Sequence, residues 1–313
     1  MKAAVVERYG PPEVVDVREV ADPVAGTGRL LVRVRATALN SGDARIRGCR
    51  FPRGFALPGR LALGIRGPRR QVLGVVYSGV VEAVGAGVEG FAVGDEVCGM
   101  TGVAMGAHAE LVAARADRAC HKPEGVDHVQ AAAILFGGST ARHFLHDLVG
   151  PGRRVLVNGA SGAVGTAAVQ LARLAGAHVT AVTSGRNEDL VRSLGAVEVV
   201  DHAVTSVTDL PASYDVVLDA VGNLGPTSGR RLLAEGGTLV LVVAGLLDTV
   251  LPRRQVRTGT SSEDPVVFTW LLDRLAAGEL RAVVDRTLPL DDVAEAHRVV
   301  DSGRKVGNLV LMP

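Results

Sequence analysis

A glycine-rich turn is the part of this sequence whose chemistry is clearest. The apolar run 154–157 is followed by Asn158 and Gly159, and Gly162 and Gly165 follow at equal intervals. Beyond them, the apolar positions recur at helical spacing. A strand that enters a helix through such a turn leaves backbone N–H groups and the positive end of the helix dipole facing outward, which suits a diphosphate. The three glycines would permit the turn, the approach of the ligand and the packing of the helix on the strand.

The sequence around the turn strengthens this interpretation, because an isolated glycine pattern also fits any glycine-rich loop of an α/β protein. A second apolar run, 177–183, follows the helical segment at the distance that a strand–helix–strand unit requires. The runs 215–221 and 238–243 are typical of buried parallel strands. The middle of the chain is therefore predicted to be α/β, with a doubly wound parallel sheet that binds a dinucleotide.

The residues after the second run indicate which dinucleotide fits. Sites for NAD usually carry Asp or Glu there, which accepts hydrogen bonds from the ribose 2′-hydroxyl. This chain has Ser184 and Arg186 instead. A hydroxyl and a guanidinium bind the 2′-phosphate of NADP, whereas a carboxylate would repel it. The alternative is an ordinary polar loop with a helix N-cap at Asn187. We favour the NADP interpretation.

Bulk composition excludes several classes of protein. A chain of 313 residues exceeds one typical domain, so two are expected. Its 34 Lys and Arg nearly balance its 33 Asp and Glu, and no long basic stretch suggests nucleic acid. No apolar run approaches the length of a membrane span. The N-terminus is charged too early for a signal peptide, and Cys49, Cys98 and Cys120 are too few and too scattered for a disulfide framework. A cytoplasmic protein is expected.

The rest of the chain is predicted to be strand-rich at first and mixed later. Short runs with frequent turns over the first third suggest a compact β-barrel-like domain. The segment 246–263 is difficult to assign and could be a loop near the active site. The predicted helices are 127–136, 139–148, 266–277 and 291–302, and the closing strand is 308–312.

Short motifs along nearly the whole chain together resemble the medium-chain dehydrogenase/reductase superfamily, most closely its zinc-free, quinone-oxidoreductase-like branch. The resemblance implies a GroES-like β-barrel domain, residues 1–122 and 263–313, and a Rossmann NADP(H)-binding domain, residues 123–262, with NADPH in the cleft between them. The motifs are Asn40-Ser-Gly-Asp43, the run 73–85, Val93-Gly-Asp-Glu-Val97, Gly138-Ser-Thr-Ala141, the glycine turn, the run 214–222 and Gly307-Asn-Leu-Val310.

The resemblance also bears on the metal and on the reaction. Where zinc-dependent relatives carry the ligands of the catalytic metal, this chain has Asn40, Val75 and Phe136, a set that cannot hold zinc. The four-cysteine structural lobe is missing as well. No metal is therefore expected, and metal-assisted alcohol oxidation is disfavoured. The reaction implied is hydride transfer from NADPH to a quinone or an α,β-unsaturated carbonyl, in which the protein positions the nicotinamide and stabilises the enolate oxygen.

The resemblance assigns the cofactor-binding residues to five groups. They are Thr140 and Asn308 beside the nicotinamide; Gly159, Ser161, Gly162, Ala163 and Val164 at the diphosphate; Ser184 and Arg186 at the 2′-phosphate; His202, where relatives often carry a tyrosine; and Val221, Gly222 and Ala244 in the walls of the cleft.

The proton donor is less well indicated. Ala44 stands where some enoyl-reducing relatives have a tyrosine, and Val76 where near relatives often have an acid. A structural role competes for most of the candidates, as a helix cap for Asp43, a surface ion pair for Arg45 and a core position for Tyr77. We favour protonation through water. The candidate catalytic residues are Asn40, Asp43, Arg45 and Tyr77.

Two other functions stay open. The loss of a polar group at Val76 and the unusual segment 246–263 would also suit a natural-product tailoring enzyme on the same scaffold, either an enoyl reductase or a repurposed non-redox enzyme. A catalytically silent NADPH-binding protein is the third possibility. The expected partner is a small-molecule substrate, and by analogy the chain forms a homodimer through the apolar region 238–251.

Overall fold

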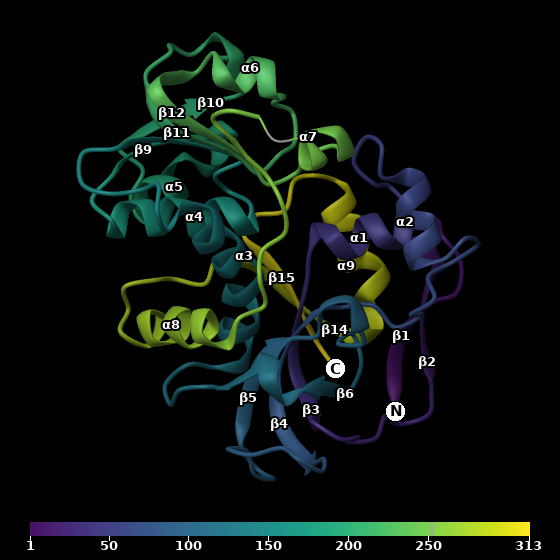
Figure 1. Ribbon diagram of the computed structural model, residues 1–313. Coiled ribbons are helices and arrows are strands. Elements are labelled where there is room, and N and C mark those ends of the chain that lie inside the picture. The colour runs from purple at the N-terminus through teal and green to yellow at the C-terminus, as the bar shows by residue number, and fades with distance from the viewer. Residues whose placement is uncertain (252) are drawn as a thin grey trace. The chain divides into compact units, whose positions relative to one another are not determined.

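The computed structural model describes every residue of the chain except 252, and it separates into two compact units (Figure 1). The first, here called the β unit, comprises Met1–Phe51, Ala56–Phe136 and Glu263–Pro313. The second, the α/β unit, comprises Pro52–Phe55 and Gly137–Ser262.

The boundary between the units falls later than residue 122, where the sequence placed it, because one long helix crosses it. That helix, α3 (His128–Leu145), starts in the β unit and continues through Gly137 and Gly138 into the α/β unit. The prediction of two separate helices, 127–136 and 139–148, is therefore wrong.

The α/β unit contains a six-stranded parallel sheet in the order β10-β9-β8-β11-β12-β13. Numbered within the unit this order is 3-2-1-4-5-6, so the strand order reverses between β8 and β11. Ligands bind at such a reversal, outside the carboxyl ends of the strands. The predicted doubly wound sheet is confirmed. The strands are β8 (Arg154–Asn158), β9 (His178–Thr183), β10 (Glu198–Asp201), β11 (Tyr214–Asp219), β12 (Leu233–Leu241) and β13 (Val256–Arg257).

Burial explains why these segments form the sheet. Val155, Leu156 and Val157 of β8 are completely buried, as are Val217 and Leu218 of β11. A strand covered on both faces needs such a continuous apolar run. The helices of this unit are α4 (Ala163–Leu174), which packs on β8 and β9, α5 (Glu188–Leu194), α6 (Pro226–Arg230) and α7 (Leu246–Val250).

The β unit consists mainly of antiparallel strands. A two-stranded sheet of β1 and β2 accompanies a seven-stranded sheet in the order β14-β15-β3-β4-β5-β7, with β6 paired to β3. Only β14 and β15 run parallel to each other. The strands are β1 (Lys2–Val6), β2 (Val15–Glu19), β3 (Arg29–Leu39), β4 (Val76–Val84), β5 (Glu96–Met100), β6 (Leu111–Arg115), β7 (Ala119–His121), β14 (Val284–Pro289) and β15 (Asn308–Met312).

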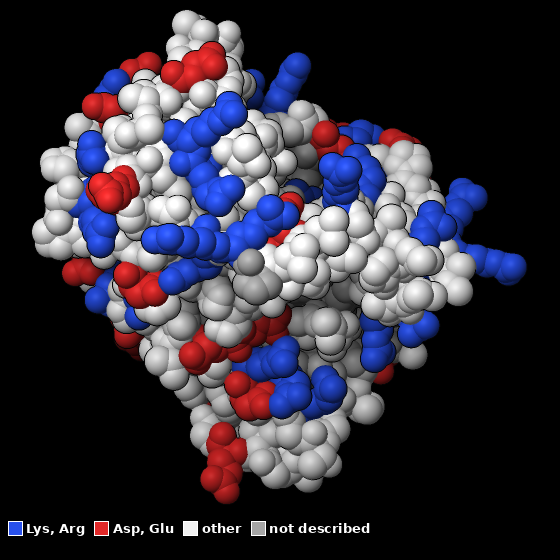
Figure 2. All heavy atoms as spheres, turned by 45° about the horizontal axis from the view of Figure 1, so that its top comes forward, with Lys and Arg blue, Asp and Glu red and all other residues white. Residues whose placement is uncertain are grey.

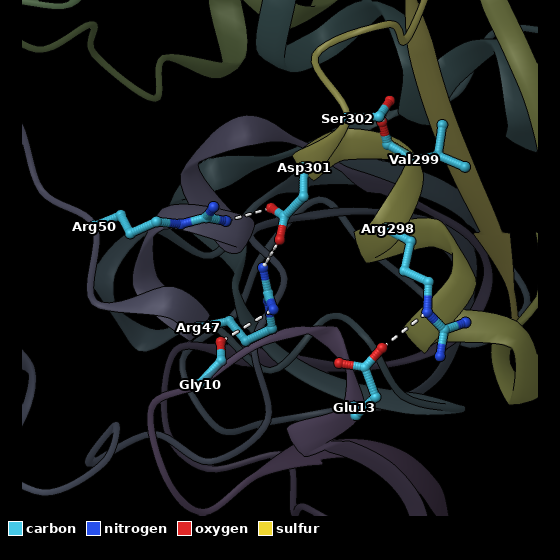
Figure 3. Close-up of polar contacts among 8 residues, drawn as sticks. All are labelled: Gly10, Glu13, Arg47, Arg50, Arg298, Val299, Asp301 and Ser302. Atoms are coloured by element: carbon cyan, nitrogen blue, oxygen red, sulfur yellow. Dashed lines mark hydrogen bonds and ion pairs between the residues drawn. The ribbon is translucent and has the colours of Figure 1, made fainter.

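Buried charge links two helices of the β unit, α1 (Ser41–Gly48) and α9 (Val293–Asp301) (Figure 3). The completely buried Arg47 guanidinium donates to the carbonyl of Gly10 at 3.1 Å and to the carboxylate of Asp301 at 2.5 Å. Arg50 pairs with the other oxygen of Asp301. These contacts hold α9 against α1. The remaining helices of this unit are α2 (Ala56–Leu63) and α8 (Pro265–Ala276).

Among the described residues, every helix is too short or too polar to cross a lipid bilayer. Lys and Arg side chains and Asp and Glu side chains both appear on the face drawn in Figure 2, in keeping with a net charge of +1.

Candidate functional site

The glycine turn lies between β8 and α4, and two of its three glycines cannot carry a side chain. Gly159 has a φ of +82°, and a Cβ there would lie 2.7 Å from Cγ2 of Val221. A Cβ on Gly165 would overlap the carbonyl oxygen of Gly159. At Gly162, by contrast, the nearest atom to a Cβ would be 3.4 Å away. The first and third glycines therefore shape the turn, whereas a Cβ at the middle one would meet only an ordinary van der Waals contact.

The amino end of α4 has the properties of an anion site. Gly162 is its N-cap and offers no side-chain hydrogen bond to the first turn, which is formed by Ala163, Val164 and Gly165. Capping side chains normally satisfy such N–H groups. Twelve residues of helix add their dipole at this point. The hydroxyl of Thr183 donates a hydrogen bond to the hydroxyl oxygen of Ser161 at 2.9 Å, which holds the Ser161 side chain in place. An uncapped helix end with glycine at its N-cap fits a diphosphate.

The turn after β9 contains the two residues predicted to select NADP. Ser184 is half-buried and precedes the 3₁₀ turn Gly185–Asn187, in which Arg186 is exposed. Asn187 does precede α5, as the alternative interpretation expected, but its side chain makes no cap hydrogen bond. The polar-loop interpretation is therefore right about the position of Asn187, but the side chain does not make the capping hydrogen bond.

The structure also brings to this turn a carboxylate, that of Asp201, which no local sequence pattern predicted. Asp201 ends β10 in register with Thr183, and its Oδ2 lies 2.5 Å from where a Cβ on Gly185 would be. Its Oδ1 accepts a hydrogen bond from the N–H of Ala203 at 2.9 Å. His202 follows it as an exposed residue whose backbone N–H donates to Thr183 at 3.0 Å. A carboxylate close to the turn bears directly on the choice of dinucleotide.

A second loop reaches the glycine turn from the carboxyl end of β11. Val221, predicted to line the cofactor cleft, places its side chain beside Gly159. Gly222 has a φ of +90°, and a Cβ there would lie 3.0 Å from Val243, just after β12. Ala244 packs against the core of the α/β unit. These predicted residues thus lie along the carboxyl edge of the sheet.

Two further predicted cofactor residues lie in different units. Thr140 of α3 belongs to the α/β unit, where its buried hydroxyl is 3.4 Å from that of Ser261. Asn308 begins β15 in the β unit, where its Nδ2 donates to the carbonyl of Val283 at 3.0 Å and its backbone N–H donates to the same oxygen. The side chain of Asn308 is therefore bonded to the residue that immediately precedes β14.

Among the candidate proton donors, Asn40 and Asp43 form a helix cap. Oδ1 of Asn40 accepts from the N–H of Gly42 at 2.7 Å, and Oδ2 of Asp43 accepts from the N–H of Asn40 at 2.9 Å. Both side chains are buried. Burial raises the pKa of the Asp43 carboxyl, and the nearby His108 opposes that shift. The capping role that competed with catalysis for Asp43 is confirmed.

Of the other two candidates, Tyr77 has the structural role that competed with catalysis, and Arg45 does not. Tyr77 is completely buried among the apolar residues of β3, β4 and β5, its hydroxyl has no hydrogen-bond partner among the described residues, and burial raises its pKa well above the usual value. Its core position is confirmed. Arg45 is half-buried, which together with Arg50 lowers its pKa. It makes no ion pair with any described residue, so its expected pairing with a surface acid is wrong.

The three positions aligned with zinc ligands lie in the β unit. Asn40 caps α1, Val75 packs against an apolar cluster, and Phe136 ends the part of α3 that belongs to this unit. Within the described part of the chain, no three His, Cys, Asp or Glu side chains gather as metal ligands.

Two family models match parts of this chain. Residues 26–124 match the alcohol dehydrogenase GroES-like domain, and residues 194–311 match the zinc-binding dehydrogenase family.

Similar proteins extend over nearly the whole chain. The mitochondrial NAD(P)H oxidoreductase RTN4IP1 of Mus musculus is 31% identical over 360 residues, covering 99% of this chain and 89% of its own length. A quinone oxidoreductase of Pseudomonas aeruginosa is 31% identical and covers 97% of both chains. The solved quinone oxidoreductase of Coxiella burnetii, 26% identical, gives a TM-score of 0.88 over 100% of this chain and 99% of its own. The chain belongs to the medium-chain dehydrogenase/reductase superfamily, in its quinone-oxidoreductase-like branch.

Proposed function

We propose that this member of an NAD(P)-dependent oxidoreductase family is an NADPH-dependent, zinc-independent enzyme that transfers hydride to a quinone or an α,β-unsaturated carbonyl. The observation that carries the proposal is the uncapped amino end of α4, with Gly162 at its N-cap, at the point where the strand order of the parallel sheet reverses. Relatives named as quinone oxidoreductases support the substrate class.

The chain's own residues would bind and orient the coenzyme. The first-turn amides of α4, at Ala163 and Val164, would hold the diphosphate, while Ser184 and Arg186 would hold the 2′-phosphate. The bound nicotinamide supplies the hydride. Zinc independence is supported by residue chemistry, because the valine and phenylalanine at two of the three aligned ligand positions offer no donor atom.

The proton that completes the reduction would come from water. In an enone, hydride adds to the β-carbon and the enolate that forms takes a proton. The Asp43 carboxylate is engaged in its helix cap, and Tyr77 is enclosed in an apolar core, so neither is placed as a proton donor to a substrate. Replacing Tyr77 with Phe would therefore leave kcat within about twofold of wild type.

A turnover experiment tests the reaction class. NADPH and the protein are mixed by stopped flow with a panel of quinones and enones, and the loss of the reduced-nicotinamide absorbance is followed. We expect oxidation with at least one member of each class. Tight NADPH binding without oxidation by any acceptor would reject the reductase and favour the silent NADPH-binding protein.

The coenzyme preference is tested with one variant and a matched control. Arg186→Gln is expected to weaken NADPH binding by about 10- to 100-fold and to leave NADH binding unchanged, because only NADPH carries the phosphate that the guanidinium would bind. Arg192→Gln removes the same charge from α5, where Arg192 pairs with Glu188 at 2.8 Å, and should alter neither affinity. An equal loss of both coenzymes in Arg186→Gln would refute the assignment.

Asp201 gives an opposing test of the same turn. Its carboxylate lies close enough to Gly185 to disfavour a second anion there, so Asp201→Asn should strengthen NADPH binding relative to NADH. A shift of the preference towards NADH would show that this turn does not bind the 2′-phosphate.

The remaining expectations stay predictions. Conversion of bulky polyketide-like substrates but not of simple quinones would favour a natural-product tailoring enzyme. The homodimer through 238–251 predicts that sedimentation equilibrium gives twice the mass of one chain, and a monomer at all concentrations would reject it. The cytoplasmic location can be checked by cell fractionation.

A further inference from the structure

Asp219 is the buried group in the α/β unit to which the sequence analysis gave no role. It is the last residue of β11, it is completely buried, and it lies in register with Asn158, the last residue of β8. The two residues therefore stand side by side at the carboxyl edge of the sheet, where the strand order reverses. Asn158 immediately precedes Gly159 of the glycine turn.

The Asp219 carboxylate is surrounded by N–H donors of its own loop. Oδ1 accepts from the backbone N–H groups of Val221 at 3.0 Å and Gly222 at 3.1 Å. Oδ2 accepts from Gly222 at 3.2 Å and from Leu224 at 3.0 Å. The side-chain amide of Asn158 donates to Oδ1 at 2.9 Å. Within the described residues, no Lys, Arg or His pairs with this carboxylate, and the hydrogen bonds that stabilise its charge come from amides.

The same contacts join the loop to the glycine turn. Asn158 also donates to Oδ1 of Asn223 at 2.7 Å, and its backbone carbonyl accepts from the N–H of Ala220. Val221, held through its own N–H, then lies against Gly159. The carboxylate thus fixes the distance between the loop after β11 and the turn after β8.

The hydrogen bonds also decide which amides stay free for a ligand. The N–H groups of Val221, Gly222 and Leu224 point inward to Asp219 and cannot bind an outside anion. At the first turn of α4, by contrast, the N-cap residue is Gly162, which has no side chain that could accept from the N–H groups. One of the two neighbouring loops is therefore filled by an internal anion, and the other is left for the diphosphate.

We infer that Asp219 is a positioning residue for dinucleotide binding: its buried carboxylate occupies the amides of loop 220–224 and holds Val221 over the glycine turn, so that the diphosphate has a single site at α4. The inference rests on the proposed dinucleotide-binding function. The residue it adds, Asp219, contacts no ligand itself and acts by holding the loop 220–224 in place.

The principal variant is Asp219→Asn, which keeps the size of the side chain and turns one acceptor into a donor. A donor facing the N–H groups of the loop cannot satisfy them, so the loop should leave its place. We expect the dissociation constants of NADPH and NADH, measured by calorimetry on folded protein, to rise by the same factor of about 10 to 100. This equality separates Asp219 from Arg186, whose loss should affect NADPH alone.

Asp215→Asn is the matched control. Asp215 lies near the opposite end of the same strand, where it accepts from the N–H of Arg154 at 2.8 Å and pairs with surface arginines. The same change of residue there should leave both dissociation constants within about twofold of wild type. If both Asn variants weaken binding equally, general loosening of the strand explains the result and the inference fails.

Chemical rescue distinguishes a positioning role from a merely structural one. Asp219→Ala leaves a space that formate can enter, so sodium formate should restore much of the NADPH affinity while equal sodium chloride should not. If Asp219→Ala and Asp219→Asn do not fold, Asn158→Ala removes one donor to the carboxylate and should weaken both coenzymes by a smaller common factor. Unchanged affinities in folded Asp219→Asn, or in Asn158→Ala where that variant must replace it, would overturn the inference. A wild-type protein that binds neither coenzyme would instead refute the proposed function.

Discussion

The two units bury carboxylates in opposite ways. In the β unit, Asp301 is held by the guanidinium groups of Arg47 and Arg50 (Figure 3). In the α/β unit, Asp219 is held by peptide and side-chain amides, and none of the described Lys, Arg or His residues pairs with it. A cation pairs two separate elements, here α1 and α9, and so supports the fold. Amides arranged around a carboxylate instead shape one loop, at the edge of the sheet where the strand order reverses.

Two buried histidines of the β unit, His108 and His297, extend this contrast. His108 Nε2 and both ring nitrogens of His297 are buried without hydrogen-bond partners among the described residues. Burial lowers the pKa of His297 to about 2, assisted by the charges of His108 and Arg47. The α/β unit is different, because the fully buried carboxylate of Asp219 accepts hydrogen bonds from three backbone N–H groups and one side-chain amide. We therefore expect changes in the β unit to alter stability, and changes at the sheet edge to alter coenzyme binding.

The largest expected effect on binding is that of Gly165→Ala. Its methyl group would overlap the carbonyl of Gly159, so the turn must shift, and NADPH affinity should fall at least about 100-fold. Calorimetric titration measures the affinity, and circular dichroism checks the fold. Gly162→Ala is the comparison, because its methyl meets only ordinary contacts and the fold should be kept. Wild-type affinity in a folded Gly165→Ala protein would contradict this account of the turn.

Asp301→Asn should give the largest loss of stability. It removes the charge that compensates the buried Arg47, so the free energy of unfolding should fall by about 3 kcal/mol, as when one partner of a buried pair is removed. Urea unfolding measures the change. Coenzyme affinity of the folded protein should stay at the wild-type value. A variant with wild-type stability and weakened binding would reverse the assignment of the two regions.

Acid should destabilise the protein through His297. Its folded-state pKa of about 2 lies below the unfolded value of about 6.5, so the unfolded chain binds the proton first and stability is lost as pH falls below about 6.5. One such group lowers the free energy of unfolding by about 2 kcal/mol between pH 7 and pH 5. In His297→Leu, the free energy of unfolding is measured with urea at both pH values. Its decrease from pH 7 to pH 5 should be smaller than in wild type by that amount. An unchanged pH dependence would show that another group is responsible.

The smallest effect is expected from Arg298→Gln, which serves as the surface counterpart of Asp301→Asn. Arg298 pairs with Glu13 at 2.9 Å, and both side chains are about half exposed. Solvent screens such pairs, so the free energy of unfolding should change far less than in Asp301→Asn when both variants are unfolded with urea. A loss as large as that of Asp301→Asn would mean that burial does not distinguish the two pairs.

The sequence predicted the sheet well because its strands are continuous apolar runs. The run 215–221 and the strand 308–312 appear close to where they were expected, and the glycine turn joins β8 to α4 as predicted. The division of α3 into two helices failed at Gly137 and Gly138, the two residues between the predicted segments. The close packing of Gly137 against the backbone of Ala163 explains the glycine there, and the helix continues through it.

The candidate site was harder to predict, since its supporting contacts join residues far apart in the sequence. Asp201 reaches Gly185 across two neighbouring strands, and Asp219 reaches Asn158 across another pair. No local pattern encodes such a pairing. A usable signal was present at Asp219 all the same: an acid that ends a completely apolar strand must find buried donors.

The most direct measurement is amide hydrogen exchange, residue by residue, with and without NADPH. The account predicts that exchange slows at Ala163, Val164 and Gly165, the uncapped first turn of α4, because the diphosphate accepts from these N–H groups. The amides of Val221 and Gly222, already bonded to Asp219, should be protected before the coenzyme is added. If NADPH binds and leaves exchange at the first turn of α4 unchanged, the central claim is wrong.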